Sequence, residues 1–313
     1  MGGGRSCVVA DKMARELVDL PLGKFLFTRV SFDSTCNAPY FRLMDADGVS
    51  VYARPVGDFT LTFDLSRKRC TGWYDMRTGE CYECPGKRDV SEKYEQCPEC
   101  QQKTGFNPAF YNTTELSAQQ AELNKKPHLL YLAYFSSETV KVGISNAGRG
   151  LARLLEQGAR SAVILETFPS ANVARQYEAQ IARLPGLCES VQLRKKAQIL
   201  VENSYDEVVA RQKLEQVTTA IQCALNVQFS NPQFAELSSI MINGAALSSC
   251  TAIELWNQPR LSGAFVGLLG QLLIMEQQNR LLVTPMKQYL GNYVTITGDV
   301  APLDLTPVQT SLF

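Results

Sequence analysis

The stretch HLLYLAYFSSETVKVGISNAGRGLARLLEQGARSAVILETFPSANVARQYEAQIAR, residues 128–183, decides the fold because its strand, turn and helix signals follow one another without interruption. Residues 129–135 form an apolar and aromatic run of strand length, and residues 139–144 alternate in period two. The polar break Ser136-Ser137-Glu138 separates the two runs. The first part of the stretch therefore predicts a β-hairpin.

The second part of the stretch changes to helical spacing. After a break at Gly148, leucines recur at positions 151, 154 and 155 until Gly158 supplies a stop. Residues 162–168 are a third short apolar strand, and Ser170 is the expected N-cap of a second amphipathic helix. The predicted order of elements is β-β-α-β-α.

The composition is that of an ordinary globular protein. The 313 residues are 45% hydrophobic, and 31 Lys and Arg balance 31 Asp and Glu, so any nucleic-acid site has to be a local basic patch. No apolar run reaches membrane-spanning length, and the N-terminus lacks the hydrophobic region of a signal peptide. We expect a cytoplasmic protein without a transmembrane segment.

Five cysteines gather between residues 70 and 100: Cys70, the pair Cys81 and Cys84, and the pair Cys97 and Cys100. Two Cys-x-x-Cys knuckles with twelve residues between them match a zinc ribbon, because each knuckle places two thiolates on one side of a tight turn and two pairs close a tetrahedron. Spacing favours Cys81 as the fourth ligand beside the other three paired cysteines. A thioredoxin-like redox pair would need a knuckle at a helix start after a parallel strand, and the sequence predicts neither. A closed four-cysteine zinc site organises the chain and does no chemistry.

Cations and aromatic rings flank the knuckles and suit a surface that follows a nucleic-acid strand, with cations on phosphates and rings on bases. Nearby acids suit a solvated face of little net charge equally well, so the sequence leaves both interpretations open. The cations and rings are Arg67, Lys68, Arg69, Trp73, Tyr74, Arg77, Lys87, Arg88 and Tyr94, and the acids are Glu80, Glu83, Asp89, Glu92 and Glu95.

Strands are predicted on both sides of the ribbon and the central stretch. Residues 24–30, 40–44, 49–54 and 59–63 predict a small antiparallel β unit, with Asp47-Gly48 as a hairpin turn. Its economical role is structural, although an oligonucleotide-binding barrel uses similar strands. Ser204-x-x-Glu207 predicts a capping box that opens a helix through about Leu225, and strands follow over 261–269, 271–275, 281–283 and 292–297. We expect an α+β chain with an N-terminal β unit (1–66), a zinc ribbon (67–106), a central core (107–190) and a C-terminal helix plus β region (191–313).

The N-terminus carries a lipidation pattern. Met1-Gly2-Gly3-Gly4-Arg5-Ser6 fits N-myristoylation, with Cys7 beside it as a second acyl site, although a flexible glycine start has the same appearance. Residues 7–20 predict a short helix that Pro21 ends.

Four residues stand out on successive elements of the central stretch: Tyr131, Lys141 in Lys141-Val142-Gly143, Arg153 and Glu178. In this respect the stretch resembles the core of the GIY-YIG nuclease superfamily. That core has the same element order, with a tyrosine on the first strand, a Tyr-Ile-Gly on the second, an arginine on the first helix and a glutamate on the next. The likeness is greatest to the divergent phage-type branch, whose second motif also tends to read Lys-Ile-Gly.

A wider set of marks, over residues from about 23 to 297, is similar to a family called domain of unknown function twenty-seven ninety-seven. This resemblance names no reaction, but it implies a zinc site that uses Cys70 and leaves Cys81 out. The marks are Cys70-Thr71-Gly72, Gln96-Cys97-Pro98-Glu99-Cys100, Tyr131-Leu132-Ala133-Tyr134, Lys141-Val142-Gly143, Gln157-Gly158-Ala159 and Gly270-Gln271.

The nuclease resemblance implies a metal-dependent endonuclease. Glu178 would bind Mg²⁺ or Mn²⁺, Arg153 would offset charge on the phosphate, and Tyr131 would activate the water. Lys141 replaces the second tyrosine and suits holding a phosphate better than acting as a base at pH 7. Arg149 competes with Arg153 for the phosphate role. A structural interpretation pairs Glu178 with Arg175 on an exposed helix face and packs Tyr131 in the sheet.

Three functions are consistent with these residues: a metal-dependent nuclease, a nucleic-acid-binding module that has lost catalysis, and a structural or protein-interaction module. We predict that Lys141, Arg149 and Arg153 form a phosphate site for DNA or RNA, with the two arginines four apart on one helix face. Glu178 is expected to be the only carboxylate within reach of a bound ion.

Overall fold

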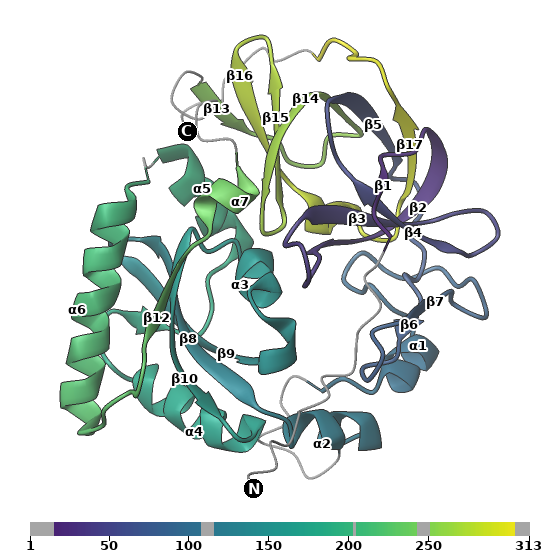
Figure 1. Ribbon diagram of the computed structural model, residues 1–313. Helices are drawn as coiled ribbons and strands as arrows, with labels where there is room; N and C mark the ends of the chain where they lie inside the picture. The colour runs from purple at the N-terminus through teal and green to yellow at the C-terminus, as the bar shows by residue number, and fades with distance from the viewer. Residues whose placement is uncertain (1–15, 108–115, 203–204, 243–250, 304–313) are drawn as a thin grey trace, which may run out of the picture.

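The computed structural model describes residues 16–107, 116–202, 205–242 and 251–303, which form two large sheets, one short hairpin and the helices around them (Figure 1). This mixed α+β class agrees with the predicted one. The N-terminal acylation pattern and most of the helix predicted over residues 7–20 lie outside the described residues. No helix in the described ranges is both long enough and apolar enough to cross a membrane.

Strands from the two ends of the chain form one ten-stranded sheet, in the order β1-β4-β3-β2-β17-β5-β14-β15-β16-β13. The sequence analysis assigned these strands to separate units, whereas β17 lies antiparallel between β2 and β5. The bounds are β1 (Val18–Asp19), β2 (Gly23–Phe32), β3 (Pro39–Met44), β4 (Ser50–Arg54), β5 (Asp58–Asp64), β13 (Thr251–Glu254), β14 (Arg260–Leu269), β15 (Leu272–Gln277), β16 (Arg280–Pro285) and β17 (Tyr293–Thr297).

The central stretch forms most of a second, five-stranded sheet in the order β11-β9-β8-β10-β12. The predicted β-β-α-β-α order is confirmed, because β8 (His128–Ser136) and β9 (Thr139–Asn146) pair antiparallel and are followed by α3 (Ala152–Gln157), β10 (Ser161–Phe168) and α4 (Ala171–Ile181). A 3-10 turn, η1 (Ala147–Arg149), precedes α3. The edge strands are β11 (Leu187–Cys188) and β12 (Gln233–Glu236).

The remaining elements flank the two sheets. The ribbon consists of the hairpin β6 (Trp73–Tyr74) and β7 (Cys81–Tyr82) with helix α1 (Pro98–Thr104), and α2 (Ala118–Asn124) follows it. The other helices are α5 (Leu193–Glu202), α6 (Glu207–Leu225), α7 (Ser238–Met241) and the 3-10 helix η2 (Met286–Tyr289). The N-cap of α6 is Asp206, whose side chain accepts from the amide of Val209, so the cap lies two residues after the predicted one.

Alternation along β8 divides the core into two layers. Tyr131, Ala133 and Phe135 belong to a core shared with α3, α5 and the ten-stranded sheet, whereas Leu130 and Leu132 belong to a core beneath α4 and α6. Figure 1 shows α3 between the two sheets, with α6 on the outer side of the five-stranded one. The central core is therefore buried against the ten-stranded sheet.

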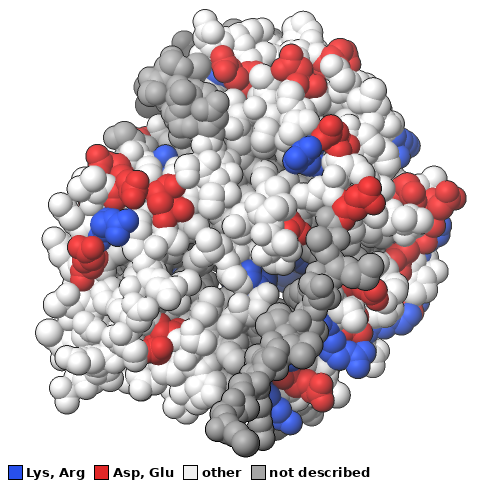
Figure 2. All heavy atoms as spheres, viewed as in Figure 1, with Lys and Arg blue, Asp and Glu red and all other residues white. Residues whose placement is uncertain are grey.

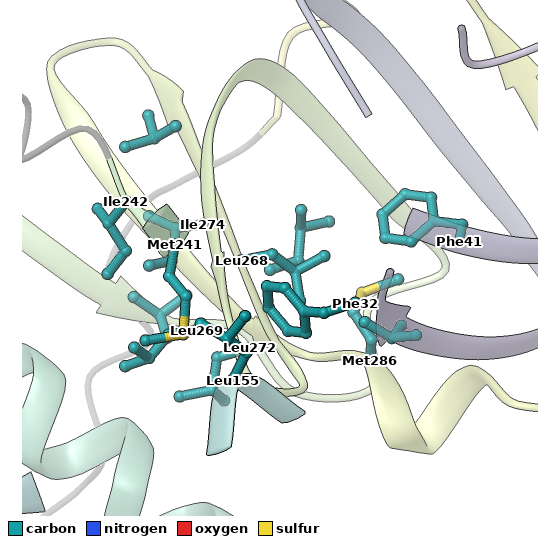
Figure 3. Packing of buried hydrophobic residues seen from close by; sticks show 14 of the residues in the cluster. Phe32, Phe41, Leu155, Met241, Ile242, Leu268, Leu269, Leu272, Ile274 and Met286 are labelled. Carbon is teal, nitrogen blue, oxygen red and sulfur yellow. The ribbon is translucent and has the colours of Figure 1, made fainter. Parts of the chain in front are cut away.

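The end of α3 meets the turn between β14 and β15 at close range. Figure 3 shows Leu155 of α3 beside Leu269 and Leu272. Gly158 and Gly270 both have a positive φ, and a Cβ added at Gly270 would lie 2.7 Å from the amide nitrogen of Gly158. Only glycine allows this approach of two backbones, which gives a physical reason for both glycines.

Candidate functional site

Four buried thiols of the ribbon lie together. Cys70, Cys84, Cys97 and Cys100 have their sulfur atoms within 4.8 Å of one another. A tetrahedral site with Zn–S near 2.3 Å has sulfur–sulfur edges of about 3.8 Å, and the Cys84 and Cys97 sulfurs are 3.8 Å apart. Burial raises the pKa of the Cys70 thiol to about 11, so this thiol stays protonated at pH 7 in the absence of a metal ion. A cation among the four sulfurs would favour their thiolate forms. The cluster fits a structural metal ion such as Zn²⁺.

The fifth thiol, Cys81, lies outside this cluster. It is half-buried on β7, where its sulfur contacts the guanidinium of Arg42 on β3. The structure thus brings together the set that includes Cys70 and not the set that spacing favoured. Contrary to the expectation from sequence, Cys97 is the N-cap of a helix, α1. A redox pair remains unsupported, because four thiols converge here and the preceding strands β6 and β7 are antiparallel.

The cations of the ribbon are largely neutralised. Ion pairs join Arg67 and Arg69 to Asp89, at 2.9 and 3.2 Å, and join Arg88 to Glu99 at 3.2 Å. Arg77 and Lys87 are paired in the same way with Asp75 and Glu83. This arrangement favours the solvated-face interpretation of the ribbon over a strand-binding surface.

Tyr131 lies across the backbone of the neighbouring strand. It is paired with Gly143 of β9, and a Cβ at Gly143 would lie 2.5 Å from the phenolic oxygen. The glycine of Lys141-Val142-Gly143 therefore makes room for the tyrosine ring. Burial raises the pKa of Tyr131, and the hydrogen-bonding guanidinium of Arg153 opposes that rise.

Lys141 projects from the same face of β9 as Gly143, since the two are two residues apart in the strand. It is buried, and its ammonium donates to the carbonyl oxygen of Glu189 at 2.6 Å. Burial, and then the charge of Arg153, lower its pKa. An anion bound beside Lys141 would therefore stabilise the charged form of its ammonium group.

Glu156, a residue of α3 that the sequence analysis did not consider, gathers three arginines. Its carboxylate contacts the guanidiniums of Arg149, of Arg153 at 3.6 Å and of Arg29 on β2 at 3.6 Å. Ser31 donates to the same carboxylate at 2.5 Å. Burial by itself would favour the neutral acid, but Arg149 and Arg29 hold the pKa of Glu156 at about 2. This carboxylate therefore joins the five-stranded sheet to the ten-stranded one through charge.

The two predicted arginines do not share one helix face. Arg149 ends the 3-10 turn η1, Gly150 has a φ of 49°, and α3 begins at Ala152, so Arg153 belongs to a separate helix. They converge nevertheless, because both reach the carboxylate of Glu156.

Lys196 of α5 is a further cation at the same place. Its ammonium donates to the carbonyl oxygen of Gln157 at 2.6 Å and lies 5.0 Å from the centre of the Phe135 ring. Burial, together with Lys141 and Arg153, lowers its pKa to about 8. Lys141, Arg153 and Lys196 thus repel one another at short range.

Glu178 is engaged as the structural interpretation expected, though not on an exposed face. Its carboxylate is buried on α4 and lies 2.5 Å from the guanidinium of Arg175. Burial raises its pKa, and Arg175 opposes that rise. Glu178 still acts electrostatically on both Tyr131 and Lys141, so the four residues that the nuclease resemblance indicated lie near one another. It is not the only carboxylate nearby, because Glu156 and Glu189 are also present.

We call the region around these side chains the basic cleft, and define it by Arg29, Lys141, Arg149, Arg153 and Lys196 around Glu156. With the Arg175, Glu178 and Glu189 cluster at its edge, six cations face three carboxylates. The region therefore carries an excess of three positive charges at pH 7, in a chain whose formal net charge is zero. Figure 2 shows basic side chains inside a hollow near the centre of this face of the molecule.

The family model described as Protein of unknown function (DUF2797) matches residues 60–294, three quarters of the chain. The chain belongs to this family. No curated protein and no solved structure matches the chain.

The span that matches the DUF2797 model includes the four clustered cysteines and most of the basic cleft. Arg29 lies outside it, on a strand that precedes residue 60. Sequence analysis missed Arg29, Glu156 and Lys196. Helical spacing offered a signal for Glu156, which is three residues after Arg153, but nothing in the sequence places β2 or α5 beside α3.

Proposed function

We propose that this DUF2797 protein binds nucleic acid through phosphate groups held in the basic cleft, and that the four-cysteine cluster holds a structural Zn²⁺. The observation that carries the proposal is a formal excess of three positive charges gathered in one region of a chain with no net charge. Local positive charge is what phosphate binding needs, because displacement of counterions from the nucleic acid supplies much of the affinity.

The pattern of repulsion among the cations supports an anionic ligand. Lys141 and Lys196 have pKa values lowered first by burial and then by neighbouring positive charge, and Arg153 contributes to both. An anion placed among these three side chains removes the repulsion and accepts their hydrogen bonds. Phosphate suits this geometry because a guanidinium binds two of its oxygens at once and ammonium groups bind the others.

Cleavage is the second candidate, supported by the proximity of Tyr131, Lys141, Arg153 and Glu178. The surroundings of Glu178 do not fit a magnesium ion in this arrangement, because Arg175 is already paired with its carboxylate and Lys141 adds a second positive charge. Phosphate binding is therefore better supported than cleavage.

The decisive measurement is fluorescence anisotropy of labelled single- and double-stranded DNA and RNA at low salt. The variant Lys141→Ala/Arg153→Ala should bind at least tenfold more weakly than the wild type. Lys125→Ala/Arg183→Ala removes the same formal charge from exposed positions and should bind as the wild type does. Full binding by Lys141→Ala/Arg153→Ala would exclude a phosphate site in the basic cleft, and a structural or protein-interaction module would then be the remaining function.

A nuclease assay with Mg²⁺ or Mn²⁺ separates binding from cleavage. If Glu178 supports cleavage, Glu178→Ala should abolish it while affinity is kept or slightly raised, since a negative charge has been removed. The expected result from the ion pair with Arg175 is binding without metal-dependent cleavage.

A further inference from the structure

We infer that the nucleic-acid strand in the basic cleft continues onto the ten-stranded sheet, where Arg29 of β2 holds a second phosphate of the same strand. This inference rests on the proposed function and extends it to the N-terminal β unit, for which sequence analysis favoured a structural role over an oligonucleotide-binding barrel. The strand would then contact both sheets at once, so that the site needs the whole fold.

The cations form a continuous series from one sheet to the other. Lys141 stands on β9, Arg153 on α3 lies close enough to lower the pKa of Lys141, and Arg153 shares Glu156 with Arg149 and Arg29. Because Arg29 comes from the ten-stranded sheet, the series crosses the boundary between the sheets. A series of cations on several elements matches consecutive phosphates of a strand better than it matches one small anion.

Glu156 orients the arginines without using all their hydrogen-bonding capacity. Three guanidiniums offer about fifteen N–H donors, whereas one carboxylate accepts at about four positions. The side chains of Arg29, Arg149 and Arg153 keep 40%, 37% and 37% of their surface exposed, against 10% for Glu156. The carboxylate is thus buried beneath the arginines, and their outer edges are presented to solvent.

The surroundings of Arg29 indicate a concave site. Burial acts to lower the pKa of this guanidinium, although Glu156 and the nearby Tyr40 and Tyr74 raise it overall. An arginine that is desolvated by its neighbours while 40% of its side chain stays exposed lines a hollow. Anions bind more strongly at such a place than on a convex surface, because water screens the charge less.

The ribbon hairpin closes one side of the cleft with Tyr74. Burial raises the pKa of Tyr74, and Arg29 and Arg149 oppose that rise, so the phenol lies beside both arginines. Trp73 and Tyr82 stack on each other with ring centres 4.3 Å apart. They alternate with Tyr74 and Cys81 along β6 and β7 and so belong to the other face of the hairpin. The path of the strand therefore passes Tyr74 and excludes the stacked pair.

The test compares Arg29→Gln with Arg153→Gln across a salt series, using a strand of about twelve nucleotides and a nucleoside monophosphate as competitor. Arg29→Gln should weaken binding of the long strand roughly fivefold and reduce the slope of log Kd against log salt by about 0.7 to 0.9. It should leave competition by the monophosphate unchanged, whereas Arg153→Gln should weaken both ligands. Arg54→Gln is the matched control, because Arg54 is an ion-paired arginine on β4 of the same sheet, and it should change neither.

The outcomes separate this inference from the proposed function. Wild-type affinity and salt slope in Arg29→Gln, with binding lost in Arg153→Gln, would overturn the role of Arg29 alone. Absence of strand binding by the wild type would overturn both. Because Arg29 also pairs with Glu156, a second measurement uses the unaltered protein: photoreactive strands should cross-link to β2 as well as to β9 and α3. Adducts on β9 and α3 without any on β2 would contradict the inference even if Arg29→Gln failed to fold.

Discussion

Replacing Glu156 by glutamine should destabilise the protein in a way that depends on pH. The carboxylate is 10% exposed, and its arginine partners hold its pKa at about 2, against an ordinary value of 4.5. That difference corresponds to roughly 3 kcal/mol of unfolding free energy when the carboxylate is ionised. The contribution is fully present above pH 4.5, where the carboxylate is ionised in both the folded and the unfolded protein. It is lost as the pH falls towards 2, because the carboxyl group then becomes protonated and no longer attracts the arginines.

Urea unfolding followed by circular dichroism at pH 7, 5 and 3 measures this contribution. We expect Glu156→Gln to be less stable than the wild type by roughly 3 kcal/mol at pH 7, and by less than half of that at pH 3. Glu215→Gln is the control, because Glu215 is exposed on α6 and belongs to no ion pair among the described residues. A difference that stays the same from pH 7 to pH 3, or one below about 1 kcal/mol at pH 7, would refute the view that Glu156 holds the arginines by charge.

Three further predictions concern the metal, the pH dependence of binding and the contact between the sheets. Elemental analysis under reducing conditions should find one zinc per chain, retained in Cys81→Ser and lost in Cys70→Ser. Zinc lost in Cys81→Ser and retained in Cys70→Ser would show instead that the fourth ligand is Cys81, as the Cys-x-x-Cys spacing favours. Lys196 loses its proton as the pH rises through about 8, whereas the guanidinium of the variant Lys196→Arg stays charged. Between pH 7 and 9, the affinity for an oligonucleotide should therefore fall roughly threefold more in the wild type than in this variant. Equal losses of affinity would contradict a role for Lys196. Gly270→Ala should cost at least about 1 kcal/mol more unfolding free energy than Gly57→Ala, since both glycines have a φ near +60° but only Gly270 meets backbone atoms.

The local order of the central core was predictable because its signals are local. The change from period two to helical spacing after Gly148 lies within the elements themselves, and no distant contact is needed to detect it. The ten-stranded sheet was not predictable in the same way. Its middle pairs Asp64 with Tyr293, and no property of either strand indicates that partner.

The candidate sites show the same division. The gathering of cysteines was visible in the sequence, but the choice between Cys70 and Cys81 depended on strand alternation, which points Cys81 towards Arg42 and away from the other thiols. Arg153 was identified through the nuclease resemblance and Arg149 through its nearness in the chain, whereas Arg29 and Lys196 enter the cleft only through the packing of β2 and α5 against the central core.

The position of β5 has a consequence for the order in which the chain folds during its synthesis. Both neighbours of β5 in the sheet, β14 and β17, come from the C-terminal part of the chain, so β5 has no strand partner until residues 260–269 have been made. At about 5 to 20 residues per second, this takes roughly ten to forty seconds after β5 emerges from the ribosome. During that time both edges of an apolar strand remain open to pairing with other chains. Residues 58–64 are therefore a segment of the nascent chain that needs protection from aggregation until its partners are made.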